Sequence, residues 1–97
     1  MQVSVVMKFL VFWKIEPEVV IRIGPESAKM LFGLQDYAKE LRAKGKLERH
    51  YHIVGKHGGV WILDVDSNEE LERLIAKMPI YNFTTYDIHP LTEMGNQ

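Results

Sequence analysis

The stretch KLERHYHIVGKHGGVWILDV, residues 46–65, predicts a β-hairpin, and this hairpin decides the fold. Residues 46–55 and 59–65 are rich in β-branched and aromatic side chains, which favour strands. The segment GKHGG between them contains three glycines, which favour a turn. We therefore expect two antiparallel strands near the middle of the chain, and the flanking elements decide what packs on them.

A helix is predicted before the hairpin, over residues 24–45. Pro25 suits the first helical position, Glu26 suits the positive end of the helix dipole, and Gly45 supplies a stop. Apolar residues recur at three- and four-residue intervals, which places them in one stripe. The stripe consists of Ala28, Leu31, Leu34, Ala38 and Leu41.

A second helix is predicted after the hairpin. Ser67 and Glu70 form the serine-to-glutamate spacing of a capping box, and Pro79 helps to end the helix. Its apolar face consists of Leu71, Leu74, Ile75 and Met78. Residues 7–15 and 80–89 are predicted strands, and the first of these is apolar on both faces, as interior strands are. Residues 17–24 have β character and are interpreted as a connector.

The resulting order is βαββαβ, the α+β ferredoxin-like arrangement of a four-stranded antiparallel sheet with both helices on one face. We expect a single domain over residues 1–97, with residues 1–6 either a disordered leader or an extension upstream of a start at Met7. The other sheet face is too apolar to stay uncovered, with Trp13 or Phe12 and Trp61 or Ile62 on it. Pairing of two sheets as a dimeric α+β barrel would cover it.

The composition excludes several classes of protein. The 97 residues are 46% hydrophobic and 26% charged with a net charge of −1, which argues against nucleic-acid and membrane partners. Without cysteine there is no disulfide, thiolate nucleophile or cysteine-bound zinc. The apolar run at residues 3–13 is too short to span a bilayer and lacks the features of a signal peptide. We expect a cytoplasmic protein.

The placement of the histidines depends on the alternation of side chains along the second predicted strand. The more apolar alternate set should pack under the helices, and this set is Leu47, Arg49, Tyr51 and Ile53. His50 and His52 would then lie on the opposite face, toward a partner sheet or a cavity. His57 falls in the loop, where a solvated imidazole is expected.

Three interpretations of His50 and His52 stay open at this point. The first is that both imidazoles are incidental on a half-solvated strand face. The second is a metal site, which would need a third ligand from Glu48 or another strand; the sequence favours this least, and we expect no bound metal. The third is a pocket for a small molecule, in which imidazole acts as a general base near neutral pH.

Two further residues are candidates for ligand binding. Gln35 lies inside the apolar stripe of the first predicted helix, about 40° from Leu31 on a helical wheel. An amide there finds a buried partner, faces a cavity or extends to the edge of the stripe. We interpret Gln35 as a hydrogen-bond donor to a ligand. Arg49 is interpreted as an anchor for a ligand carboxylate, although strand alternation directs it to the helix side.

Residues 38–91 resemble the muconolactone isomerase family. The resemblance rests on ELRAKGKLERHYHIVGKHGG, VWILDVDSNEELERLIAKMP and YDIHPL, and the first strand, MKFLVFWKI, is compatible with it. It implies a small α+β-barrel protein of aromatic catabolism that assembles as a dimer, often as a decamer, and uses no metal or organic cofactor. Family enzymes shift a double bond in a five-membered unsaturated lactone by moving a proton α to a carbonyl.

The sequence departs from the family pattern at one chemically important place. The family enzymes carry an acid on the inner side of the first helix, where this sequence has Leu34 or Gly33. We therefore expect an isomerase-like protein with a pocket for a small lactone or carboxylate metabolite, in which His52 or His50 is the base. The alternative is a non-catalytic small-molecule-binding or assembly module of the same fold.

Overall fold

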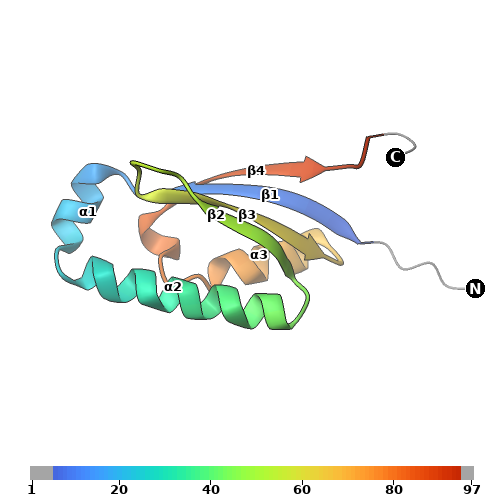
Figure 1. The fold of residues 1–97 in the computed structure, drawn as a ribbon, viewed down its shortest axis with the longest axis horizontal. Helices are drawn as coiled ribbons and strands as arrows, with labels where there is room; N and C mark the ends of the chain where they lie inside the picture. The colour runs from blue at the N-terminus through green and yellow to red at the C-terminus, as the bar shows by residue number, and fades with distance from the viewer. Residues whose placement is uncertain (1–5, 95–97) are drawn as a thin grey trace, which may run out of the picture.

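The computed structural model describes residues 6–94 and forms a four-stranded antiparallel sheet with helices α2 and α3 on one face (Figure 1). The elements in chain order are β1 (Met7–Lys14), α1 (Pro17–Ile23), α2 (Glu26–Ala43), β2 (Leu47–His52), β3 (Gly58–Val65), α3 (Asn68–Ala76), the 3₁₀ helix η1 (Tyr81–Phe83) and β4 (Thr85–Leu91). The predicted ferredoxin-like order is confirmed. The leader or upstream extension expected at residues 1–6 lies outside the described residues, except for Val6.

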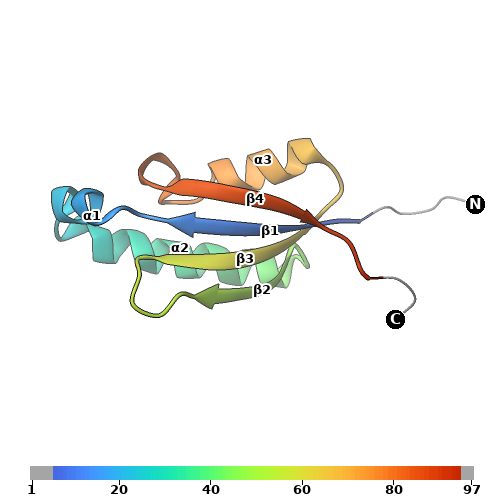
Figure 2. The ribbon, with the colours of Figure 1, turned by 90° about the horizontal axis from the view of Figure 1, so that it is seen from above.

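The strands are ordered β2-β3-β1-β4, so β1 is an interior strand as predicted (Figure 2). Phe9, Val11 and Trp13 alternate toward the helices on β1 and are buried. Trp61, Leu63 and Val65 do the same on β3. The opposite face is half-buried in its apolar centre, which consists of Leu10, Phe12, Val60 and Ile62. Both tryptophans therefore belong to the helix side, and Phe12 and Ile62 belong to the outer face.

The two long helices bury their apolar stripes against this sheet. In α2 the buried residues are Leu34, Ala38 and Leu41, while Ala28 and Leu31 of the predicted stripe are exposed. The hydroxyl of Tyr37 donates a 2.6 Å hydrogen bond to the carbonyl of Leu74 and so links α2 to α3. Burial raises the pKa of Tyr37 to about 12, which keeps this donor protonated.

The predicted cap at the start of α3 is confirmed for Ser67, while the Glu70 carboxylate binds one residue before the N-cap. The hydroxyl of Ser67 accepts a 3.1 Å hydrogen bond from the backbone N–H of Glu70. The Glu70 carboxylate in turn accepts a 2.7 Å bond from the backbone N–H of Asp66 and lies 3.0 Å from the ammonium of Lys46. The serine contact satisfies an N–H group of the first helical turn, and the glutamate contact satisfies the N–H group of the residue just before the N-cap.

Two segments differ from the sequence prediction. Helix α1 (Pro17–Ile23) replaces the predicted connector at residues 17–24, because Pro17 begins it, Val19 and Val20 pack against the core, and Gly24 ends it at φ 66°. Tertiary packing there outweighs the β propensity of the segment. The last strand is shorter than predicted, since residues 81–83 form a 3₁₀ turn before β4. Within residues 6–94, no helix is long and apolar enough to cross a membrane.

Candidate functional site

A β-bulge in β2 sets the geometry of the site. Leu47 pairs with Leu63, but Arg49 pairs with Ile62, so Glu48 is an extra residue in the strand. The Glu48 carboxylate forms an ion pair with Lys8, whose ammonium also lies 3.2 Å from Asp64. This network lies on the outer face and holds Glu48 there.

The bulge reverses the alternation of every residue that follows it in β2. His50 pairs with Trp61 and His52 pairs with Gly59, so both imidazoles lie on the helix side. Arg49 and Tyr51 pair with Ile62 and Val60 and lie on the outer face. The predicted faces of these four residues were therefore wrong, because simple alternation does not include the extra residue.

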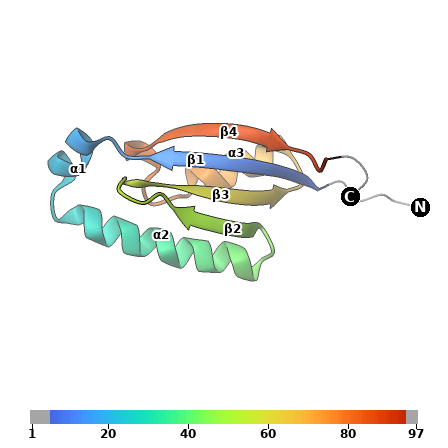
Figure 3. The same ribbon diagram turned by 45° about the horizontal axis from the view of Figure 1, so that its top comes forward.

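A cavity of about 470 Å³ lies between α2 and the β2 end of the sheet. Figure 3 shows α2 running alongside β2 at this edge. The cavity is lined by Trp13, Leu31, Leu34, Gln35, Ala38, His50, Tyr51, His52, His57, Gly58 and Trp61. It thus brings together Gln35, His50 and His52 from two elements, and adds His57 from the hairpin loop. An apolar lining with a few polar groups at the rim is the usual form of a small-molecule site.

The two tryptophans form the apolar floor of this cavity. Trp13 extends across β3, because a Cβ added to Gly59 would lie 2.9 Å from the Trp13 Nε1 atom. The glycine is therefore required by the close approach of the indole. Trp61 packs in an edge-to-face arrangement with His50, with ring centroids 6.1 Å apart. This contact orients the His50 ring at the cavity wall.

The cavity floor also contains an unsatisfied hydrogen-bond donor. The Trp13 indole N–H is buried and has no hydrogen-bond partner among residues 6–94. A buried donor without a partner costs on the order of 1–3 kcal/mol. A buried group of this kind needs an explanation, such as an ordered water, an ion or a role in a functional site.

The polar rim defines what chemistry the cavity supports. Its ionisable side chains are three exposed histidines, since the side chain of Tyr51 lies on the outer face, and none of the described lining residues carries a carboxylate. Among residues 6–94, no group of three or more histidine, aspartate or glutamate side chains is placed to bind a metal ion. The arrangement offers imidazole as proton acceptor and the Gln35 amide as hydrogen-bond donor.

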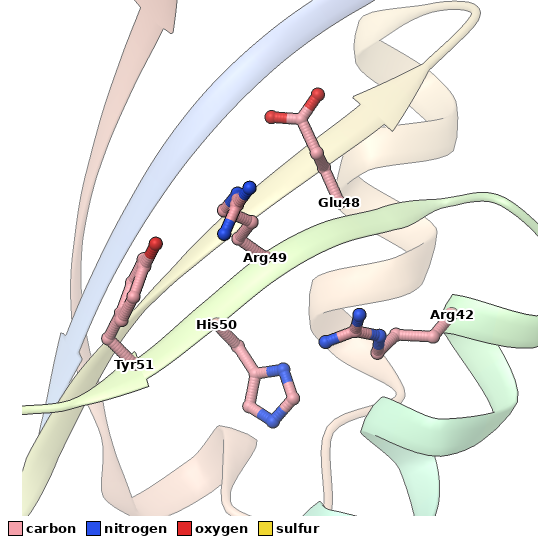
Figure 4. A pocket seen from close by; sticks show the side chains of 5 residues that line it. All are labelled: Arg42, Glu48, Arg49, His50 and Tyr51. Carbon is pink, nitrogen blue, oxygen red and sulfur yellow. The ribbon is translucent and has the colours of Figure 1, made fainter.

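A second hollow, of about 490 Å³, lies at the exposed edge of β2 (Figure 4). It is lined by Arg42, Glu48, Arg49, His50 and Tyr51. Arg49, predicted as a carboxylate anchor, belongs to this hollow and does not line the cavity. Sequence reasoning also missed Arg42, which continues the spacing of the cavity-lining residues along α2, and His57, whose loop position suggested only solvent exposure.

The fold and the site define a class of protein, namely a small ferredoxin-like α+β domain with a histidine-rimmed cavity under one edge strand. The sequence profile of the muconolactone delta-isomerase family matches residues 7–97, and the chain belongs to this family.

Individual relatives agree with this assignment. The chain is 33% identical over 60 residues to muconolactone delta-isomerase of Rhodococcus opacus, and 32% identical over 57 residues to that of Cupriavidus pinatubonensis. These matches cover 62% and 59% of this chain, and 64% and 62% of the relatives, which is less than two thirds of their length.

A solved structure has the same fold. It is 5-chloro-2-hydroxyhydroquinone dehydrochlorinase from Burkholderia phenoliruptrix, in complex with 2,5-dihydroxybenzoquinone. The TM-score is 0.67 with 19% sequence identity, covering 91% of this chain and 96% of the other. At this identity the likeness concerns the fold alone.

Proposed function

We propose that this protein binds a small unsaturated ring metabolite, a lactone or a carboxylate, in the cavity between α2 and β2. The observation that carries the proposal is the meeting of Gln35, His50 and His52 at one cavity with a tryptophan floor. Membership of the muconolactone delta-isomerase family supports a lactone, and the quinone bound to the dehydrochlorinase supports a planar oxygenated ring of similar size. Two indoles suit the faces of such a ring.

The reaction we propose is a double-bond shift without a cofactor. His52 or His50 takes the proton α to the lactone carbonyl, and the electron pair of the broken C–H bond forms a dienolate. The negative charge that develops on the carbonyl oxygen is stabilised by N–H donors, and we assign this role to the Gln35 amide. The protonated imidazole returns a proton to another carbon of the dienolate, so that substrate and product are isomers and the base is regenerated.

Turnover of muconolactone, followed by its ultraviolet absorbance, tests this proposal. Because the lining residues of the cavity in the described part include no carboxylate, we expect turnover on the order of 10²-fold or more below that of an enzyme with a well-placed base. His52→Gln or His50→Gln should abolish it. His89→Gln, a histidine on β4 and away from the cavity, is the matched control and should retain it.

The outcomes separate the alternatives. Binding of muconolactone without turnover would assign the protein to the non-catalytic binding modules of this fold. Full turnover that survives both histidine substitutions would place the base elsewhere and refute the role of this cavity.

We also propose that two copies of the chain pair through their outer sheet faces. The support is the apolar centre of that face, Leu10, Phe12, Val60 and Ile62, which a monomer leaves half-exposed. Light scattering at micromolar concentration should give the mass of a dimer or a larger symmetric assembly, and Phe12→Lys should lower it. A monomer with a cooperative thermal transition would remove this proposal.

A further inference from the structure

The hollow at the edge of β2 adjoins the cavity, because His50 and Tyr51 line both. Figure 4 shows Arg42 reaching from the end of α2 toward the side of β2 on which His50 lies. Arg49 and Tyr51 point to the other side of the strand, in agreement with their pairing. On the side that is continuous with the cavity, the hollow therefore presents the guanidinium of Arg42.

Arg42 also continues the row of residues by which α2 lines the cavity. Leu31, Gln35 and Ala38 line the cavity, and Arg42 follows them at a spacing of four, three and four residues. Residues at these spacings share one face of a helix. From Gln35 to Arg42 the helix rises about 10.5 Å. A ring held between Gln35 and His50 would thus have a substituent directed along this row toward Arg42.

The charge around the hollow is positive because its carboxylate is already paired. Glu48, the acidic lining residue, forms its ion pair with Lys8. Other cations of this region also have partners, since Lys44 lies 3.3 Å from Glu40 and Lys46 lies 3.0 Å from Glu70. Neither Arg42 nor Arg49 has an ion-pair partner among residues 6–94.

We infer that Arg42 forms the subsite for an anionic group of the ligand and determines the preference for a ring that carries a carboxylate. A guanidinium binds a carboxylate through two parallel hydrogen bonds, which fixes orientation as well as charge. The position of the ring rests on the proposed function, and the subsite determines which rings are accepted. Arg42, and not Arg49, is then the anchor.

The test compares two probes of the same shape, benzoate and benzamide, by calorimetric titration of the full chain. The unaltered protein should bind benzoate more tightly than benzamide. Arg42→Gln should weaken benzoate binding about tenfold or more, the usual effect of losing a charge-assisted hydrogen bond, and leave benzamide binding unchanged. Arg42→Lys should restore part of the preference, since it keeps the charge but not the planar pair of donors.

The matched control is Arg73→Gln, because Arg73 is likewise an exposed arginine in the last turn of its helix, α3. It changes net charge and helix-dipole interactions equally and should leave both affinities unchanged. Equal affinity of the unaltered protein for both probes, no binding of benzoate at millimolar concentration, or a larger loss in Arg49→Gln than in Arg42→Gln would overturn the inference. Muconolactone turnover is read separately, so a preference for benzoate without turnover would refute the proposed reaction and leave the subsite standing.

Discussion

The two edges of the sheet carry hollows of different kinds. Under β4, α3 leaves a space of only about 210 Å³, lined by Asn68, Leu71, Glu72, Ile75, Tyr81, Tyr86 and Ile88. Under β2, α2 leaves a cavity of about 470 Å³ with a histidine rim. The helices differ accordingly. A side-chain cap begins α3, whereas the N-cap of α2, Pro25, makes no side-chain cap bond, and α2 directs Leu31 and Gln35 to the cavity.

This difference indicates that the two halves of the sheet, with α3 under β4 and α2 under β2, have different roles. The β4 half encloses the smaller hollow and begins its helix with a side-chain cap. The β2 half encloses the larger cavity, at which the Trp13 indole donor has no partner among residues 6–94. Sites that bind ligands commonly lie in the less stabilised part of a fold. Substitutions in the two halves should therefore differ in what they change.

The largest contrast is expected between two large-to-small substitutions. Ile75→Ala in α3 removes a side chain that is 5% exposed and should lower the free energy of unfolding by about 2–5 kcal/mol. Leu31→Ala removes one that is 37% exposed at the cavity and should cost about 1 kcal/mol or less. Urea denaturation measures both. Equal losses of unfolding free energy in the two variants would contradict the proposed difference between the two halves.

The second contrast concerns glycines. A Cβ on Gly59 would lie 2.6 Å from the Tyr51 carbonyl oxygen and 2.9 Å from the Trp13 Nε1 atom, and the backbone cannot move away easily. Gly59→Ala should therefore cost about 1–3 kcal/mol by overpacking and displace the cavity floor.

Gly33→Ala is the control, because a Cβ there meets Pro79 at an ordinary 3.4 Å. Gly33 lies in the middle of α2, so this substitution should stabilise the protein by up to about 1 kcal/mol. A Gly59→Ala protein as stable as the parent in thermal denaturation would show that the indole does not depend on this glycine.

A smaller effect is expected at the helix starts. Ser67→Ala removes the cap of α3 and should cost about 1 kcal/mol of unfolding free energy. Ser27→Ala, in the first turn of α2, removes no side-chain cap and should be neutral or slightly stabilising. Chemical denaturation measures the free energy of unfolding of both variants. A greater loss for Ser27→Ala than for Ser67→Ala would show that the start of α2, and not that of α3, depends on a serine side chain.

The smallest effect is a dependence on pH that originates in the β4 half. The backbone N–H of Asp66, followed by the Lys46 ammonium, lowers the pKa of Glu70. Because the pKa is lower in the folded state, ionised Glu70 stabilises the fold at neutral pH, and this contribution is lost as the pH falls through the folded-state pKa. Glu70→Gln should cost less than about 1 kcal/mol at neutral pH and nothing in acid. A difference that is constant with pH would exclude this origin.

Helices α2 and α3 and the order of the elements along the chain were predictable because their signals are local. The capping residues Ser67 and Glu70, and apolar intervals of three and four residues, specify α3 without knowledge of its neighbours. The same holds for most of α2. The amide of Gln35 within an apolar stripe left a cavity as one of three interpretations, and Gln35 does line the cavity.

The features that the sequence did not predict depend on contacts between residues that are far apart in the chain. The faces of His50 and Arg49 follow from the bulge at Glu48, which is held by Lys8 from another strand. The alternation of side chains counted along one segment does not reveal a bulge, because a bulge is defined by the pairing with the neighbouring strand. Likewise, α1 forms from β-branched residues because Val19 and Val20 reach the core.

The single extra residue in β2 also matters for how this protein can change during evolution. Deletion of Glu48 would move His50 and His52 to the outer face and bring Arg49 and Tyr51 to the cavity, without any substitution. A change in chain length by one residue would therefore exchange the side chains of the proposed ligand site with those of the proposed subunit-pairing surface. In comparisons among relatives, a gap at this position carries more information about function than the identity of the residues beside it.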